Sequence, residues 1–255
     1  MDKHARLDTL LAMCRDSGKI TVSEVSHSLG VSEMTIRRDF EELAQRGYVE
    51  RIRGGIRLLS PSHGAPAQET PYFEKMQLHR SEKQLIAEAA ADLIEPHDTV
   101  FLGSGSTCAA IARCLPAAPL RVVTNSLLVY HELKNAEHIE LCIIGGSLHA
   151  SSASTVGPIS EEMLSCIGID KSFIGANGIV RTEVYTSNID EGRLQDLAFR
   201  RSAQQFIVAD HSKIDQTGFY NFYRLDHVSG LITDGGCTPS QLDRLQGHTQ
   251  VILAG

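Results

Sequence analysis

Residues 30–40, which read GVSEMTIRRDF, decide the fold of the amino-terminal part of the chain. Gly30 is a typical stop for a short helix that Ser23 can cap, and Ser32 is a good cap for the next helix. Ile36, Phe40 and Leu43 then recur at helical spacing until Gly47. Two helices joined by a short turn that contains glycine are typical of a helix-turn-helix.

The exposed face of the second of these helices carries hydroxyls followed by arginines. When Ile36, Phe40 and Leu43 face inward, the outward positions include the four residues Ser32, Thr35, Arg37 and Arg38. Such side chains at the leading end of a helix suit the base edges of the DNA major groove. A charged helix face is also common on an ordinary solvated surface, and acidic residues lie among these arginines. Charge alone therefore does not decide between a DNA-binding face and a solvated one.

A hairpin follows this helix, and another helix precedes the pair. Residues 48–52 alternate between apolar and polar, residues 53–55 read RGG and suit a turn, and residues 56–59 suit a second strand. This pattern predicts a hairpin. Arg51, Arg53 and Arg57 lie on it, where they suit phosphate contacts that give salt-dependent affinity. Leu7, Leu10, Leu11 and Cys14 predict a first helix that ends near Gly18, and residues 20–22 predict only a brief strand or turn.

The charge is divided unevenly along the 255 residues. The net charge is −7, yet residues 1–60 hold ten basic and nine acidic residues, whereas the remainder holds 14 and 22. The acidic total therefore does not exclude DNA as a partner. The six cysteines form no C-x-x-C pair and the eleven histidines form no H-x-x-x-H or H-E-x-x-H pattern, so no metal site is predicted. Without a signal peptide or a long apolar stretch, we expect a cytoplasmic protein with no membrane partner.

Residues 60–71 hold three prolines and little apolar content, which indicates a linker. We therefore expect a DNA-binding domain over 1–60, a linker over 61–78 and a second domain over 79–255. In that domain, helices alternate with strands near 98–102, 121–124, 139–144, 173–175, 206–209, 231–233 and 251–253. Such alternation predicts an α/β fold with a mostly parallel sheet.

Polar residues collect where these strands end, and the loop Gly103-Ser104-Gly105-Ser106-Thr107 is the most informative. Glycines let a backbone approach an anion, and the start of a helix adds N–H groups and a positive dipole end. Many strand-to-helix turns simply need glycine, so the loop alone leaves both explanations open. The loop lacks the Walker and G-x-G-x-x-G patterns, so neither ATP nor a dinucleotide cofactor is predicted.

The S-x-x-T-I-R-R-D string of residues 32–39 and the Arg53-Gly54-Gly55 wing resemble the DeoR/GlpR family of bacterial repressors. Further landmarks follow in the family's order at 124–126, 145–146, 190–191 and 210–213, so the resemblance spans nearly the whole chain. It implies a winged helix-turn-helix in which Ser32, Thr35, Arg37 and Arg38 face operator DNA. It also implies that the second domain shares the fold of ribose-5-phosphate isomerases.

The same resemblance implies a sugar-phosphate effector. Its phosphate would lie in the loop Gly103, Ser104, Gly105, Ser106 and Thr107, with Gly145 and Gly146 beside the ligand. Lys213 would add positive charge, and Asn125 and Glu191 would contact hydroxyls. Two residues depart from the family pattern: Gln195 stands where a lysine is frequent, and Glu183 where a glycine is frequent. Residues 146–151 are similar to the repressor of a deoxyribonucleoside operon, which implies deoxyribose 5-phosphate or a similar ligand.

Two functions of different classes fit these features. The first is a transcriptional repressor of a sugar or nucleoside operon that binds double-stranded operator DNA as a homo-oligomer, a dimer or larger, because operators mirror two-fold symmetry. The second is a sugar-phosphate isomerase with an appended domain, with Asp190, Glu191 and Lys213 in the roles that enediolate chemistry needs. An isomerase has no use for the string at 32–39, which favours a regulator and not an enzyme.

Overall fold

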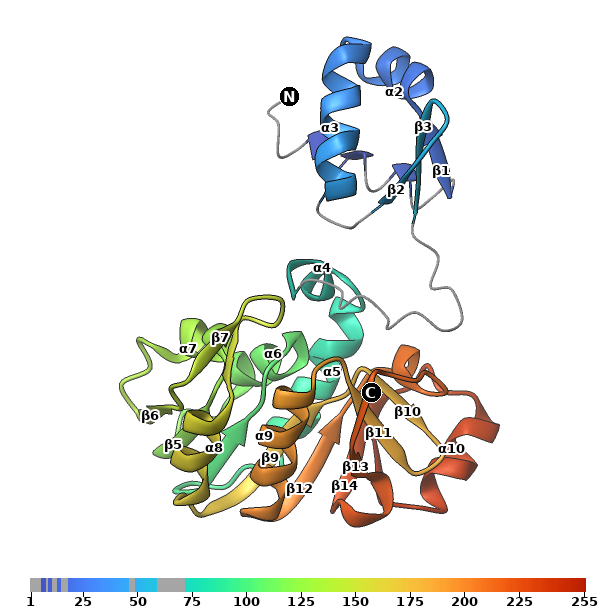
Figure 1. Ribbon diagram of the computed structural model, residues 1–255. Coiled ribbons are helices and arrows are strands. Elements are labelled where there is room, and N and C mark those ends of the chain that lie inside the picture. Colours follow the sequence, from blue (N-terminus) through green and yellow to red (C-terminus); the bar gives the residue numbers. More distant parts are fainter. Residues whose placement is uncertain (1–5, 8, 11–12, 15–17, 46–48, 59–71) are drawn as a thin grey trace. The chain divides into compact units, whose positions relative to one another are not determined.

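The computed structural model describes residues 6–7, 9–10, 13–14, 18–45, 49–58 and 72–255. The chain forms two compact units, Met1–Ala65 and Pro66–Gly255 (Figure 1). Residues 72–78 of the predicted linker lie in the second unit, where Tyr72–Gln77 form helix α4. The domain limits predicted from the sequence, at 60 and 79, stay predictions.

The amino-terminal unit is a winged helix-turn-helix. Its described elements are β1 (Lys19–Thr21), α2 (Val22–Leu29), α3 (Glu33–Gln45), β2 (Val49–Ile52) and β3 (Gly55–Leu58), and the antiparallel sheet has the order β1-β3-β2. The inward face of α3, Ile36, Phe40 and Leu43, is buried against Leu10 and Cys14. The predicted helices, hairpin and brief first strand are thus confirmed. The predicted first helix and its end near Gly18 fall partly outside the described residues, and the stop at Gly47 falls wholly outside them.

One predicted helix cap is wrong. Thr21, not Ser23, caps α2, because the Thr21 side chain accepts from the Glu24 N–H while the Glu24 carboxylate accepts from the Thr21 N–H at 3.0 Å. This reciprocal pair is a capping box. Gly30 ends α2 in the left-handed conformation with φ 64°, as the sequence predicts. The Ser32 hydroxyl accepts from the Thr35 N–H at 3.3 Å, so Ser32 starts α3.

The two glycines of the wing serve different needs. Gly54 has φ 81°, which favours glycine at the turn between β2 and β3. Gly55 pairs with Thr21 of β1, and a Cβ atom at this position would lie 2.1 Å from the Ile20 carbonyl oxygen. Strand β1 therefore pairs with β3 of the wing only because residue 55 has no side chain.

The carboxy-terminal unit is built on a seven-stranded parallel sheet. Its order is β15-β14-β12-β9-β4-β5-β6. The strands are β4 (Thr99–Leu102), β5 (Leu120–Thr124), β6 (Ile139–Ile143), β9 (Ile169–Gly175), β12 (Ser202–Val208), β14 (Gly230–Asp234) and β15 (Val251–Ala254). Each strand expected from the sequence is present, and all neighbours in the sheet run parallel. The predicted fold class is confirmed.

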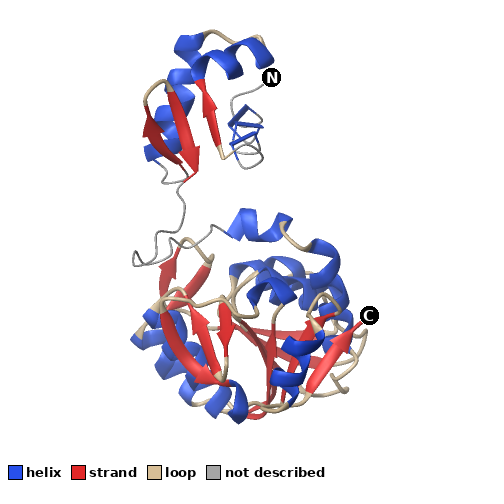
Figure 2. Ribbon diagram, turned by 90° about the vertical axis from the view of Figure 1, so that its right-hand side faces the viewer, coloured by secondary structure: helices blue, strands red, loops and turns tan. Residues whose placement is uncertain are grey.

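Helices cover both faces of this sheet (Figure 2). One core contains residues of α5 (Arg80–Ala91), α6 (Ser106–Cys114) and α7 (Leu127–Leu133), and the other contains residues of α8 (Pro158–Ser165), α9 (Ile189–Arg200) and α10 (Pro239–Gln246). Neighbouring strand residues alternate between the cores: Val100 and Leu102 belong to the first and Phe101 to the second. This alternation is that of a sheet buried on both sides.

Two small antiparallel additions were not expected from the sequence. One is the sheet of β10 (Gly178–Val180), β11 (Glu183–Thr186) and β13 (Tyr220–Arg224), and the other is the hairpin of β7 (Ser147–His149) and β8 (Ser154–Val156). Short 3-10 turns lie on either side of β13, at His211–Lys213 before it and at Leu225–His227 after it. In the part of the chain that the structure describes, no helix combines the length and apolar character needed to cross a membrane.

Candidate functional site

The first candidate surface is the start of α3. Ser32, Arg37 and Arg38 are exposed, and Thr35 is half-buried with its hydroxyl 3.0 Å from that of Ser32. Met34 lies between them with 63% of its surface exposed, although sequence reasoning did not single it out. An exposed apolar side chain at this place suits a thymine methyl group. The five residues together offer a mixed polar and apolar surface of the kind that reads base edges.

The arginines of this surface differ in their partners. Arg37 pairs with Glu33 at 3.2 Å, and Arg51 of β2 lies 3.5 Å from Glu41. Arg51 also donates to the Arg37 carbonyl oxygen at 3.3 Å, which fixes the wing beside α3. Arg53 at the turn and Arg57 on β3 are exposed, as the sequence predicts. All five arginines are therefore accessible to a phosphate backbone.

Asp39 is the one acidic residue of the string at 32–39 that turns inward. It is buried, and it accepts from Arg6 through both carboxylate oxygens, at 2.6 Å from Nε and 3.2 Å from Nη2. Such a fork geometry is the strong form of the arginine–carboxylate pair. Its charge is thereby neutralised inside the unit, where it does not oppose DNA.

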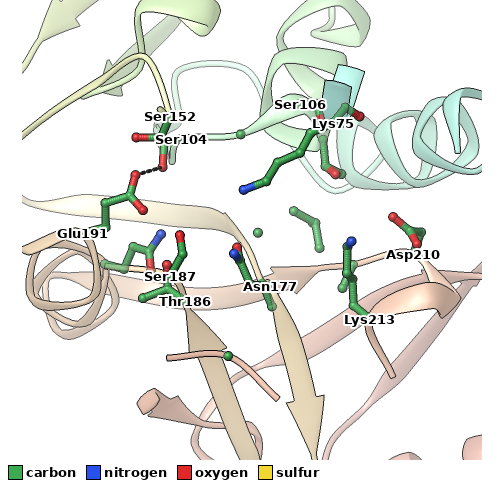
Figure 3. A pocket seen from close by; sticks show the side chains of 18 of the residues that line it. Lys75, Ser104, Ser106, Ser152, Asn177, Thr186, Ser187, Glu191, Asp210 and Lys213 are labelled. Atoms are coloured by element: carbon green, nitrogen blue, oxygen red, sulfur yellow. Dashed lines mark hydrogen bonds between the residues drawn. The ribbon is translucent and has the colours of Figure 1, made fainter. Parts of the chain in front are cut away.

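The second candidate site is a cavity of about 230 Å³ in the carboxy-terminal unit (Figure 3). It lies at the carboxyl ends of β4, β9 and β12, where ligands of parallel sheets bind. The antiparallel additions close it with Thr186, Ser187 and residues 217–219, and α4 contributes Lys75. In Figure 3, Glu191 and Ser187 lie on one side, Lys213 and Asp210 on the other, and Lys75 reaches between them.

One side of the cavity is cationic. Lys83 and Lys213 line it together with Asp210, and the Lys75 side chain reaches from α4 into the middle of the cavity. Lys83 is buried, and its ammonium donates to the carbonyl oxygens of Lys75 and Leu78. Burial lowers the pKa of Lys83, and the nearby charge of Asp210 opposes that shift. Asp210 is itself buried and accepts from the Ser212 N–H at 3.1 Å.

The amino terminus of α6 opens onto the cavity. Gly105, with φ 114°, precedes the helix, and Ser106 and Thr107 in its first turn line the cavity. The first intrahelical bond runs from the Ala109 N–H to the Gly105 carbonyl oxygen at 3.1 Å, so the N–H groups of residues 106–108 have no acceptor within the helix. Together with the helix dipole, these groups favour an anion such as a phosphate.

Glu191 lies in the first turn of α9, which Asn188 caps by accepting from the N–H groups of residues 190 and 191 at 2.8 and 3.1 Å. The carboxylate is buried, and its Oε1 accepts from Ser104 at 3.3 Å and Ser154 at 3.2 Å. Burial raises the pKa of Glu191, but hydrogen bonds from His149 and Ser152 and the charges of His149 and Lys75 act against it, and the net pKa is lowered. The carboxylate is therefore ionised at neutral pH and is held in a fixed orientation.

The cavity brings together six of the ten effector residues expected from the sequence: Ser104, Gly105, Ser106, Thr107, Glu191 and Lys213. Four do not line it, namely Gly103, Asn125, Gly145 and Gly146. The Asn125 amide donates to the Thr155 carbonyl oxygen at 2.8 Å, and the Gly145 carbonyl oxygen accepts from Ser160 at 2.7 Å. These residues hold loops around the cavity, and their predicted ligand contacts stay predictions.

Several lining residues escaped the sequence analysis. They are Lys75, Lys83, Asn177, Thr186 and Ser187, whereas Asp210 was noted only as part of the landmark at 210–213 and Gln195 only as a departure from a family pattern. One signal was available: Lys83 lies three, four and seven residues before Ile86, Ala87 and Ala90 and so interrupts the apolar stripe of α5. Glu183, the other departure, does not line the cavity and accepts from the Tyr185 hydroxyl.

Two family models match the two units. A DeoR-like helix-turn-helix domain matches residues 6–62, and a DeoR C-terminal sensor domain matches residues 78–235. The chain belongs to the DeoR family. This DeoR-family protein is therefore a DNA-binding transcriptional regulator with a sensor domain, and not an isomerase.

Curated relatives are similar to this chain over its whole length. The lactose phosphotransferase system repressor of Streptococcus mutans serotype c is 34% identical, covering 99% of this chain and 100% of its own. That of Lactococcus lactis subsp. lactis is also 34% identical, covering 100% of both chains. Among solved structures, ribose 5-phosphate isomerase A from Methanocaldococcus jannaschii matches with 18% identity and a TM-score of 0.39, over 53% of this chain and 54% of that one. The sorbitol operon regulator SorC from Klebsiella pneumoniae matches with 10% identity and a TM-score of 0.39, over 96% and 99%.

Proposed function

We propose that this DeoR-family protein represses a carbohydrate operon and that a phosphorylated sugar in the cavity changes its affinity for operator DNA. The observation that carries the proposal is the polarity of the cavity. Lys83, Lys213 and the start of α6 lie on one side, the ionised Glu191 lies on the other, and Lys75 reaches between them. A sugar phosphate has the matching polarity, with an anion at one end and hydroxyl groups at the other.

The charges and the size of the cavity support this class of ligand. Three lysines face two carboxylates, those of Glu191 and Asp210, which leaves an excess of positive charge for a phosphate. The cavity volume of about 230 Å³ is below the usual range for drug-sized ligands and suits a monosaccharide. In the proposed complex, the Thr107 hydroxyl and the N–H groups of the α6 first turn bind the phosphate, and Lys213 adds charge.

The names of the relatives favour a sugar handled by a phosphotransferase system, whereas the similarity at residues 146–151 favours deoxyribose 5-phosphate. Both are phosphate monoesters with free hydroxyl groups. A binding screen that includes hexose 6-phosphates, ribose 5-phosphate and deoxyribose 5-phosphate separates the two alternatives.

For DNA, we propose that Ser32, Thr35, Arg37 and Arg38 enter the major groove and that Arg51, Arg53 and Arg57 contact phosphates. Met34 joins the first group, because its exposed side chain lies among them. A homo-oligomer presents two such readers to a two-fold symmetric operator. The protein acts where its operator lies, in the cytoplasm.

Helix α4 is the proposed route from the cavity to the DNA-binding unit. The Lys75 carbonyl oxygen accepts from the Lys83 ammonium and from the Ser106 hydroxyl, the latter at 3.3 Å. A phosphate bound at Ser106 changes these bonds at the end of α4, and α4 is the first described helix after the segment that leaves the winged helix. A coupling free energy of about 1–3 kcal/mol is typical of such regulation.

Fluorescence anisotropy with a selected operator duplex tests the proposal. At fixed salt, the wild-type protein should bind the duplex with an affinity that a sugar phosphate changes by about 5- to 150-fold. Inorganic phosphate and the unphosphorylated sugar serve as control ligands. If no compound of the screen changes either the melting temperature or the DNA affinity, a sugar-phosphate sensor is ruled out.

A further inference from the structure

Two buried polar atoms in the cavity have no hydrogen-bond partner among the residues that the structure describes. They are Gln195 Oε1 and Ser187 Oγ, and both residues line the cavity. The Gln195 side chain is only 7% exposed. Since nearly all buried polar groups in native proteins are hydrogen-bonded, two exceptions in one cavity point to a partner that the ligand supplies.

Both atoms lie on the Glu191 side of the cavity. Gln195 follows Glu191 by four residues in α9, which places the two side chains on the same face of the helix. Figure 3 shows Ser187 beside Glu191 and away from Lys213. The unpartnered groups therefore belong to the Glu191 side of the cavity, away from Lys213.

The chemistry of this side selects an uncharged group. A hydroxyl group of the ligand both donates and accepts, so it satisfies the Gln195 amide and the Ser187 hydroxyl together. A second phosphate or a carboxylate would instead face the ionised Glu191, and the neutral amide offers no compensating charge. The positive charge of Lys75 does not compensate a second anion of the ligand, because that charge already acts on Glu191.

We propose that Gln195, assisted by Ser187, is the specificity-determining residue of the sensor. It binds a hydroxyl group at the ligand end opposite the phosphate and excludes ligands that carry a second anionic group there, such as sugar bisphosphates and phosphorylated sugar acids. This inference rests on the proposed function, since it assumes that the ligand is a sugar phosphate.

Isothermal titration calorimetry on the full chain tests the proposal with matched ligand pairs. Each pair shares one phosphate and differs at the other end: glucose 6-phosphate with 6-phosphogluconate, and fructose 6-phosphate with fructose 1,6-bisphosphate. In each pair, the wild-type protein should bind the ligand with an anionic group at the second end at least about 10-fold more weakly than the ligand with a neutral second end. Deoxyribose 5-phosphate and ribose 5-phosphate complete the set of neutral-ended ligands.

Two substitutions separate the contributions of shape and charge. Gln195→Met keeps the length of the side chain and removes its polar atoms, and it should weaken neutral-ended ligands by about 5- to 10-fold. Gln195→Lys supplies a cation, so it should narrow or reverse the preference against the second anion. Gln246→Lys makes the same change in charge at an exposed site in α10 and should leave the preference unchanged.

The outcomes distinguish a failure of the proposed function from a failure of the role proposed for Gln195. If the wild-type protein binds none of these ligands, the proposed sugar-phosphate function fails and the subsite fails with it. If it binds neutral-ended ligands but Gln195→Lys leaves the ratio within each pair unchanged, the function stands and the role of Gln195 is overturned. A wild-type protein that binds both members of a pair equally also overturns it. Melting curves of each variant without ligand show whether the fold is intact.

Discussion

Replacing Thr107 with valine separates one proposed phosphate contact from the stability of the fold. Thr107 lies in the first turn of α6 with 9% of its surface exposed, and its hydroxyl makes no hydrogen bond within the described part of the chain. Valine has the same shape without the hydroxyl. Thr107→Val should therefore leave the unliganded protein nearly as stable as the wild type, while the complex loses one bond to a charged acceptor.

The size of the effect follows from that bond. A hydrogen bond to a charged group contributes about 1.5–3 kcal/mol, which corresponds to a roughly 10- to 150-fold increase in Kd. At a ligand concentration of about 100 times the wild-type Kd, binding stabilises the wild-type sensor by about 2.7 kcal/mol. If the Kd rises about 30-fold, the same concentration stabilises the variant by only about 0.9 kcal/mol. For a unit of this size, the ligand-induced shift in Tm should fall from about 5–11 °C to about 2–4 °C.

Calorimetry gives the Kd directly, and thermal unfolding with and without ligand gives the linked shift in Tm. Thr107→Ser keeps the hydroxyl and should retain most of the affinity. Ser106→Ala provides the contrast, because the Ser106 hydroxyl already donates to the Lys75 carbonyl oxygen and its loss also affects the unliganded protein. If Thr107→Val binds the sugar phosphate as tightly as the wild type, the phosphate does not lie at the start of α6.

Three further substitutions test other parts of the molecule. Arg38→Ala removes an exposed guanidinium from the start of α3, so operator affinity measured by anisotropy at fixed salt should fall by about 10-fold or more; an unchanged affinity would remove Arg38 from the interface. Asp39→Ala leaves the Arg6 guanidinium without its buried carboxylate and should destabilise the winged unit by about 3 kcal/mol in urea unfolding, whereas a loss below 1 kcal/mol would mean that water replaces the pair. Glu191→Gln tests the pH dependence. Because the folded pKa of Glu191 lies below its ordinary value of 4.5, its ionised form contributes stability that is present above that value and is lost as pH falls through the folded pKa. The difference in the free energy of unfolding between wild type and variant should therefore shrink at acid pH, and a difference that stays constant to about pH 3 would contradict the lowered pKa.

The fold was predictable because its signals are local. The strands contain short apolar runs, and all of them except β15 are followed in the sequence by a helix or a loop of small and polar residues. In the winged unit, the inward apolar stripe marks α3, Gly30 marks the end of α2, and Gly54 marks the turn between β2 and β3. The small antiparallel sheet was missed because β10 and β11 are short and β13 lies more than 30 residues later, so that no local pattern joins them.

The cavity was predictable only where one strand runs directly into the next helix. The loop between β4 and α6 fits that case, and Ser104 to Thr107 were found from their composition. Lys75 and Lys83 come from helices that precede the sheet, and Asn177 and Ser187 come from connections of the added sheet. Their place in the cavity depends on contacts between segments far apart in the sequence, which composition and spacing do not report.

Two of the expected effector residues that do not line the cavity, Asn125 and Gly146, hold the loops around it. Asn125 exchanges bonds with the backbone of Thr155, at 2.8 Å from its amide to the Thr155 carbonyl oxygen and 2.9 Å from the Thr155 N–H to its own carbonyl oxygen. A Cβ atom at Gly146 would overlap the Ser160 hydroxyl, so this glycine permits the close approach of α8 to the β7–β8 hairpin. That hairpin carries Ser154, which donates to Glu191. Because these contacts help to position the Glu191 carboxylate, we expect substitutions at Asn125 and Gly146 to alter ligand affinity without removing an atom that lines the cavity.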